Sequence, residues 1–372
     1  MKELRDFKLK INPFRTIPSI NSDEIIWAGF HTVKDRIKTQ ILRIIKLRNS
    51  RLVLNWGEYG SGKTHSARYF SKDSVLAELA ATNSLPLSFD ISFPKGKDPI
   101  KEIFNQIIDR MNFQVIRENL NSVLDIPNAV KAITDSLLIK HLLSFIFNKD
   151  LNISSDIIKS YLYGTISKKE LSIFIENGVQ RELSYDSDYT DFLAGLFSLI
   201  SFDKKAFSCI VLWIDEFEDI SILNTTGITK INNFIRTLID KTPNNLLIFL
   251  NLTQSSMMDV TDLGDYLSEA VRSRIKDRIE FAFPDHDQLV DYLAELLANP
   301  IVREGANIAD NKFYPFNQDV VEAILKKFPT VSLRKYNLIF SNLLELALCD
   351  LDDCNEIKLD FYNQNIEEIV PI

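Results

Sequence analysis

The chain has 372 residues, of which 45% are hydrophobic and 25% charged, and its formal net charge is −8. This composition is typical of a soluble globular protein with two domains or one enlarged domain. The net negative charge excludes a general electrostatic attraction to nucleic acid, so any contact with DNA has to come from a local basic patch. We expect no signal peptide and no membrane anchor, because the N-terminus lacks an apolar segment and no apolar run approaches about 18 residues.

The cysteine and histidine content narrows the chemistry further. Cys209, Cys349 and Cys354 form no CxxC pair and leave an odd number, and the four histidines form no ligand cluster. This pattern argues against a disulfide framework and against a zinc site. We therefore expect a cytoplasmic protein.

The first hundred residues alternate between helical and strand patterns. Residues 31–51 place apolar side chains at helical spacing, with a basic opposite face, and predict a helix. Residues 52–56 predict a short buried strand, and the apolar positions after Lys63 predict a helix. Alternation over 84–93 predicts a second strand and is followed by a helix over 98–111. This order is typical of an α/β protein with a parallel sheet.

The middle of the chain departs from that order and then returns to it. Residues 115–205 are helical in pattern with no convincing strand, and we interpret them as an insertion between strands of the sheet. Strand and helix patterns then resume at 209–220, 228–239, 246–253, 263–275 and 278–283. Three helical patterns follow, at 285–300, 317–328 and 332–348, and a weak strand candidate at 356–362.

One glycine-rich stretch carries a complete chemical motif. Residues 57–64, GEYGSGKT, fit G-x-x-x-x-G-K-[ST] between a predicted strand and a predicted helix. Glycines let backbone N–H groups turn toward a phosphate, the lysine meets its oxygens, and the threonine hydroxyl can ligate Mg²⁺. We predict a phosphate-binding loop rather than a mere turn, formed by Gly57, Glu58, Tyr59, Gly60, Ser61, Gly62, Lys63 and Thr64. His65, the next residue, could touch the nucleotide or lie on the helix surface.

An acidic pair ends the next buried strand. Asp215 and Glu216 follow the apolar run that begins at Cys209. The carboxyl end of a parallel strand lies where a phosphate loop is found, so Asp215 can hold Mg²⁺ through water and Glu216 can orient or deprotonate an attacking water. A solvated strand end is the alternative. We interpret Glu218 and Asp219 as surface residues.

Together these segments resemble the Walker A and Walker B motifs of the AAA+ ATPases. The resemblance implies an α/β P-loop NTPase with a parallel sheet, the helical insertion at 115–205 and a small C-terminal helical lid. It implies an ATPase core over 1–285, a lid over 286–372, and ATP with Mg²⁺ as cofactors.

The same resemblance implies further site residues. Thr253, or alternatively Asn251, stands where sensor 1 occurs in such proteins. Arg334, at the start of a lid-like helix, resembles sensor 2. Three arginines are candidates for an arginine finger, in the order Arg274, Arg272 and Arg278.

Within AAA+, the order NPF, WAGF, helix and phosphate loop is similar to the Orc/Cdc6 and ExeA/TnsC-like group. SYLYGTISKKEL (160–171) and IVLWIDEFED are also similar to ATPases of bacterial BREX-type phage-defence operons. Origin-recognition proteins carry a winged-helix DNA-binding domain after the lid, for which we expect no room here.

Charge is distributed unevenly along the chain. Residues 31–51 hold seven Lys or Arg and one acidic residue, whereas 341–372 hold eight Asp or Glu and Lys358. This distribution is compatible with two solvated faces, with a nucleotide-dependent contact between subunits of a homo-oligomer, or with a basic N-terminal face that follows DNA.

Two functions are compatible with all of this. One is an oligomeric ATPase that remodels or loads a DNA-bound partner, in phage defence or DNA transactions. The other is a nucleotide-dependent switch or scaffold that regulates a partner effector protein with little turnover.

Overall fold

The computed structural model describes residues 2–17, 21–80, 84–151, 153–254, 260–305, 311–351 and 355–369. The chain divides into two compact units. The first unit comprises Met1–Asp35, Gly57–Lys72 and Glu280–Ile372, and the second comprises Arg36–Trp56 and Asp73–Ile279.

The second unit is built on a five-stranded sheet of order β2-β3-β4-β1-β5. The strands are β1 (Arg51–Glu58), β2 (Leu87–Ser92), β3 (Ile210–Asp215), β4 (Leu246–Gln254) and β5 (Ile275–Phe281), and the last residues of β1 and β5 belong to the first unit. β2, β3 and β4 are parallel, with Ser92 opposite Asp215. The predicted α/β class and parallel sheet are confirmed.

Both faces of the central strands are buried, which explains their unbroken apolar sequences. On β3, Ile210, Leu212 and Ile214 belong to the main apolar core of the second unit. On the other face the rings of Trp213 and Phe249 stack, with their centroids 3.9 Å apart. Asp215 is two residues after Trp213 and therefore lies on the same face of the strand. It is the last residue of β3, so its carboxylate stands at the carboxyl end of the strand.

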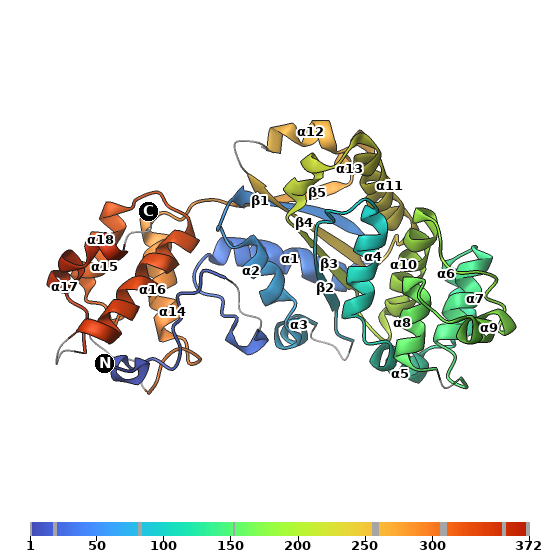
Figure 1. Ribbon diagram of the computed structural model, residues 1–372, viewed down its shortest axis with the longest axis horizontal. Helices are drawn as coiled ribbons and strands as arrows, with labels where there is room; N and C mark the ends of the chain where they lie inside the picture. The colour runs from blue at the N-terminus through green and yellow to red at the C-terminus, as the bar shows by residue number, and fades with distance from the viewer. Residues whose placement is uncertain are drawn as a thin grey trace. The chain divides into compact units, whose positions relative to one another are not determined.

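Helices flank the strands of the second unit (Figure 1). Among the described residues these are α3 (Asp73–Ala80), α4 (Pro99–Arg110), α11 (Thr225–Lys241), α12 (Leu263–Tyr266) and α13 (Glu269–Arg272), with α1 (His31–Lys46) starting in the first unit. α4 and α11 pack against each other, and α4 also contacts β2. Their apolar faces complete the core that the sheet begins.

The insertion is helical, as expected, and its described residues contain no strand. Its helices are α5 (Phe113–Val123), α6 (Ile126–Ile133), α7 (Leu137–Ile146), α8 (Ser155–Tyr163), α9 (Lys168–Glu176) and α10 (Asp186–Ile200). In Figure 1, α6 and α7 lie beside α10, which they contact, and α10 contacts α4 and α11. The insertion therefore shares one apolar core with the sheet.

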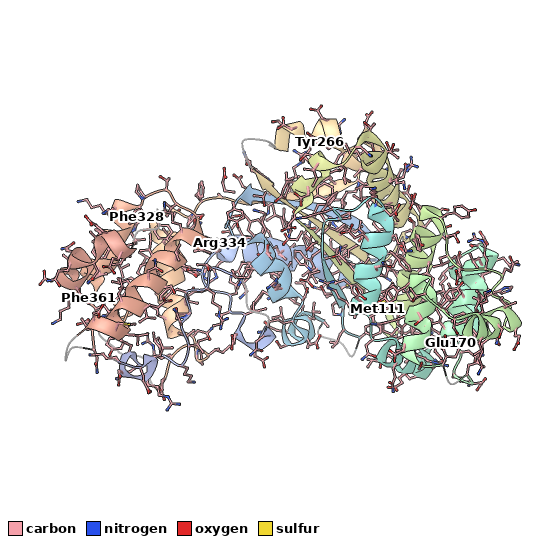
Figure 2. The ribbon with its side chains drawn as sticks, viewed as in Figure 1. Met111, Glu170, Tyr266, Phe328, Arg334 and Phe361 are labelled. Carbon is pink, nitrogen blue, oxygen red and sulfur yellow. The ribbon has the colours of Figure 1, made fainter. Side chains whose placement is uncertain are left out.

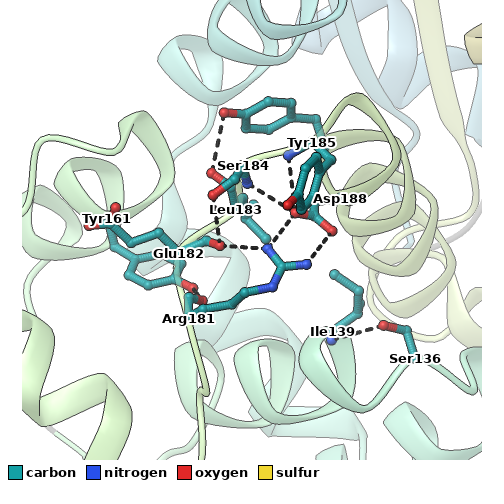
Figure 3. Close-up of polar contacts among 10 residues, drawn as sticks. Ser136, Ile139, Tyr161, Arg181, Glu182, Leu183, Ser184, Tyr185 and Asp188 are labelled. Atoms are coloured by element: carbon teal, nitrogen blue, oxygen red, sulfur yellow. Dashed lines mark hydrogen bonds and ion pairs between the residues drawn. The ribbon is translucent and has the colours of Figure 1, made fainter.

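A polar cluster fixes the segment that leads into α10 (Figure 3). Arg181 makes a two-pronged ion pair with Asp188, at 2.6 and 2.9 Å. The Asp188 carboxylate also accepts the backbone N–H groups of Ser184 and Tyr185. The Tyr161 hydroxyl donates to the Arg181 carbonyl at 2.6 Å and ties this turn to α8. These bonds satisfy the two backbone N–H groups that precede α10 and fix the start of that helix.

The first unit contains α2 (Lys63–Phe70) and a C-terminal group of helices. These are α14 (His286–Ala298), α15 (Gln318–Lys327), α16 (Leu333–Asp350), α17 (Leu359–Gln364) and α18 (Ile366–Ile369). The N-terminal NPF segment packs onto them, because the Phe14 ring stacks on Phe340 at 5.3 Å and meets Phe316 edge-on at 5.6 Å. The N-terminal segment and the C-terminal helices therefore share one core.

The predicted strand at 356–362 is wrong. Ile357 makes a single parallel bridge to Phe316, and α17 then begins at Leu359. The Ile357 backbone N–H donates to the Pro315 carbonyl, and the Ile357 carbonyl accepts from the Asn317 N–H. These two bonds form the bridge. With no further pairing, the following residues take helical hydrogen bonds instead.

Two smaller expectations concern membranes and cysteines. None of the helices in the described residues is long and apolar enough to cross a bilayer. Cys209 is buried and Cys349 exposed, and both are free thiols, whereas Cys354 lies outside the described residues.

Candidate functional site

The glycine-rich loop in the first unit connects the end of β1 to the start of α2. A Cβ on Gly57 would lie 2.3 Å from the Phe281 carbonyl oxygen, and a Cβ on Gly60 would lie 2.7 Å from the Arg334 Cβ. The backbone at both positions also has positive φ, 158° and 76°. Glycine is therefore required at two of the predicted motif positions by the protein's own packing.

The Lys63 side chain lies inside this loop. It is 6% exposed, and its ammonium donates to the Gly57 and Glu58 carbonyls at 2.8 and 2.9 Å and to the Ser61 hydroxyl at 3.1 Å. These three acceptors are uncharged oxygens. The loop thus holds a fixed positive charge beside the N-terminus of α2, where the helix dipole also favours an anion.

The predicted sensor residue Arg334 contacts the same loop, although it lies 275 positions from Tyr59 in the sequence. Figure 2 labels it at the start of α16. Its backbone N–H donates to the Gly60 carbonyl at 3.3 Å, and its guanidinium donates to the Tyr59 hydroxyl and lies 5.0 Å from the centre of that ring. The first unit therefore brings two predicted site segments together.

His65, by contrast, is committed to the N-terminal segment. Its Nε2 is 2.8 Å from the Ile26 carbonyl, and its ring lies 6.2 Å from that of Trp27. Burial lowers the pKa of His65, so the neutral imidazole donates to Ile26. These contacts give the side chain a structural role, and a contact with nucleotide stays a prediction.

In the second unit, a line of side-chain hydrogen bonds crosses three strands. Asn55 on β1 donates from Nδ2 to the Asn251 Oδ1 on β4 at 2.9 Å, and Asn251 donates from Nδ2 to the Asp215 Oδ1 on β3 at 3.2 Å. Asn55 and Asn251 are fully buried. The strand that leads into the glycine-rich loop is thus connected, two residues before Gly57, to the predicted metal-binding carboxylate.

Of the two sensor 1 candidates, Asn251 is the one whose side chain contacts Asp215. The Thr253 backbone N–H donates to the Glu218 carboxylate at 2.8 Å. Glu218 is therefore more than the surface residue we expected, because it holds the end of β4.

The Glu216 carboxylate lies in an ion pair. Its backbone is left-handed, with φ 57°, which turns the chain sharply at the end of β3. Lys95, in the loop after β2, lies 3.0 Å from Glu216 and 2.9 Å from Asp219. The two carboxylates, Asp219 foremost, raise the pKa of Lys95. Asp219, which we also expected at the surface, thus helps to fix the ammonium that meets Glu216.

The three arginine-finger candidates differ in their contacts. Arg274 makes a two-pronged ion pair with Asp240 at the end of α11, at 2.8 and 2.9 Å. Neither Arg272 nor Arg278 has a side-chain ion pair within the described ranges. Arg274 is thus bound within its own chain, whereas Arg272 and Arg278 are exposed.

Sequence reasoning missed several polar partners at these positions. Asn55 is the one that carried a signal, because an asparagine interrupts the otherwise apolar run LVLNW. Lys95 and Glu218 carried none, since their partners lie on other strands and loops.

The comparisons with known proteins agree with this fold. No family model matches the chain, and no curated protein matches it. The ORC2 protein of Aeropyrum pernix in its ADPNP-ADP complexes is similar, with a TM-score of 0.57 and 12% identity over 97% of this chain and 72% of that chain. Its ADP form has a TM-score of 0.56 and 12% identity, over 97% and 73%.

At this identity the similarity shows the fold alone. The five-stranded sheet, the loop between β1 and α2 and this similarity together confirm the predicted α/β P-loop NTPase fold. The resemblance to BREX-type ATPases is not tested by them and stays a prediction.

Proposed function

We propose that this protein binds ATP through the loop Gly57–Thr64 and hydrolyses it. The observation that carries the proposal is the buried Lys63 ammonium, held by uncharged oxygens at the N-terminus of α2. An ammonium group and the N-terminus of a helix both attract an anion, and a phosphate group accepts charge-assisted hydrogen bonds from such donors. The ORC2 structures of A. pernix, which contain ADPNP or ADP, support an adenine nucleotide as that ligand.

The proposed roles follow the chemistry of each group. Lys63 and the loop backbone bind phosphate oxygens, and the oxygens of Thr64 and Asp215 are the hard donors that Mg²⁺ prefers. The metal would supply charge neutralisation on the phosphates when bound. Glu216 orients or deprotonates the attacking water, and Asn251 fixes the Asp215 carboxylate. For sensor 1 we therefore place Asn251 ahead of Thr253.

The arginine finger is reassigned in the same proposal. Because Asp240 holds Arg274, we propose that Arg272 or Arg278 completes the site of a neighbouring subunit. Hydrolysis in a nucleotide-dependent homo-oligomer would then drive rearrangement between subunits and remodel or load a DNA-bound partner. Phage defence is the proposed setting only through the resemblance to BREX-type ATPases.

The alternative is a nucleotide-dependent switch that regulates an effector protein. The Lys95–Glu216 ion pair favours it, because it engages the proposed catalytic carboxylate and so slows turnover. A partner protein that displaced Lys95 would then control the chemistry.

The test is a set of binding and turnover measurements on the full chain. Wild type should bind Mg·ATP and hydrolyse it, and Glu216→Gln should bind it equally well without turnover. Lys97→Ala, which changes an exposed lysine outside the predicted site residues, is a surface control and should behave as wild type. Turnover by Glu216→Gln at the wild-type rate would contradict the assigned role.

Adding duplex DNA separates the two candidate functions. Strong stimulation of turnover supports the remodeller, whereas slow turnover unchanged by DNA supports the switch. Reversing Lys34, Lys38 and Arg43 to Glu should abolish ATP-dependent assembly if α1 forms the subunit contact, and should abolish salt-sensitive DNA binding by a monomer if it follows DNA.

A further inference from the structure

Tyr59 lies in the glycine-rich loop, between Gly57 and Gly60. Its side chain is 66% exposed. Its exposed ring is nevertheless engaged, because the Arg334 guanidinium lies 5.0 Å from the ring centre and donates from Nη1 to the hydroxyl. One tyrosine therefore holds the guanidinium both by its face and by its hydroxyl.

The backbone keeps these two side chains together. The Arg334 N–H donates to the Gly60 carbonyl at 3.3 Å, so the start of α16 is bonded directly to the loop. A Cβ at position 60 would lie 2.7 Å from the Arg334 Cβ and 3.2 Å from the Ser332 hydroxyl, so only glycine allows this close approach. Ser332 caps α16, so the helix start that carries Arg334 is itself fixed. The pair is therefore built into the loop.

The guanidinium is only partly used by this contact. Arginine has five N–H donors in a planar fork, and Tyr59 takes the bond from Nη1. Within the described part of the chain, no side chain accepts a bond from Nε or Nη2 of Arg334. Tyr59 thus restrains the guanidinium and leaves donors for a phosphate.

From this geometry we propose that Tyr59 is a positioning residue for Arg334 in nucleotide binding. The tyrosine holds the guanidinium beside the phosphate loop before the nucleotide arrives. The Arg334 side chain therefore loses less conformational entropy when the nucleotide binds. The inference rests on the proposed ATP function and extends it to a residue whose motif position accepts any amino acid.

A double-mutant cycle with Mg·ATP tests this inference. Tyr59→Ala should weaken ATP binding about tenfold and Tyr59→Phe, which keeps the ring, about threefold. In an Arg334→Ala background, Tyr59→Ala should cause no further loss, because the residue acts through Arg334. The nucleotide-free melting temperature shows that each variant is folded, and a merely structural role would change it together with affinity.

The outcomes separate the inference from the proposed function. Wild-type affinity in Tyr59→Ala, or a full additional loss in the Arg334→Ala background, overturns the role of Tyr59 and leaves the ATP site intact. Failure of the wild-type protein to bind Mg·ATP overturns the proposed function and this inference with it.

Discussion

The glycine-rich loop and the strand ends of the sheet build their polar contacts in different ways. Three oxygens that accept hydrogen bonds from Lys63, on Gly57, Glu58 and Ser61, lie within six residues of it, so these contacts of the loop come from local sequence. Asp215 is instead held by Asn251, and Asn251 by Asn55, across separations of 36 and 196 residues. A local contact set leaves its signature in a sequence motif, whereas a non-local set becomes visible only in the folded sheet.

The largest effect should come from adding a Cβ within the loop. Gly57→Ala should lower the free energy of unfolding by about 2–4 kcal/mol, because the methyl group meets the Phe281 carbonyl oxygen and a positive φ. Gly62→Ala is the matched control in the same loop. Its Cβ meets nothing within 4 Å, so it should cost only about 1–2 kcal/mol through its φ of 101°. Equal losses in urea denaturation would contradict this packing.

At the strand ends, the two sensor candidates should differ in turnover. Asn251→Ala should lower the ATPase rate about 10- to 100-fold, because it removes the amide that contacts Asp215. Thr253→Ala should stay within about threefold of wild type, since the Thr253 contact with Glu218 uses the backbone N–H. A larger loss of steady-state ATPase rate in Thr253→Ala than in Asn251→Ala would favour Thr253 as sensor 1 instead.

Asn251 shows what the sequence could and could not predict. Apolar runs and a complete motif were sufficient for the five strands of the sheet, the loop and the place of Asp215 at the end of β3, because those depend on local pattern. The choice between Asn251 and Thr253 depended on which side chain lies between Asp215 and Asn55, and strand order decides that. Likewise, nothing local indicated that Asp240 would bind Arg274 or Lys95 would meet Glu216.

The arginine candidates predict a smaller difference, in stability. Arg274→Ala should lower the free energy of unfolding by about 1 kcal/mol, because it breaks a partly exposed two-pronged ion pair with Asp240. Arg272→Ala should change it by less than about 0.5 kcal/mol. Thermal unfolding measures both changes in stability. A larger loss for Arg272→Ala than for Arg274→Ala would show that Arg272, and not Arg274, is the arginine that stabilises the fold.

The smallest expected effect is the pH dependence that His65 adds. Burial lowers the pKa of His65 below its usual value of 6.5, so the unfolded chain binds this proton more tightly than the folded one. Stability should therefore be complete above about pH 6.5 and fall as the pH drops below it. His65→Gln should flatten this decline in denaturation curves. A wild-type slope in His65→Gln would contradict the assignment.

The most direct test of the central claim is a calorimetric titration of wild type and Lys63→Ala with Mg·ATP. The buried ammonium of Lys63 should provide saturable binding at one site per chain, and its removal should weaken that binding by at least about 100-fold. Equal affinity in the two proteins, with Lys63→Ala folded, would show that the glycine-rich loop is not where the nucleotide binds.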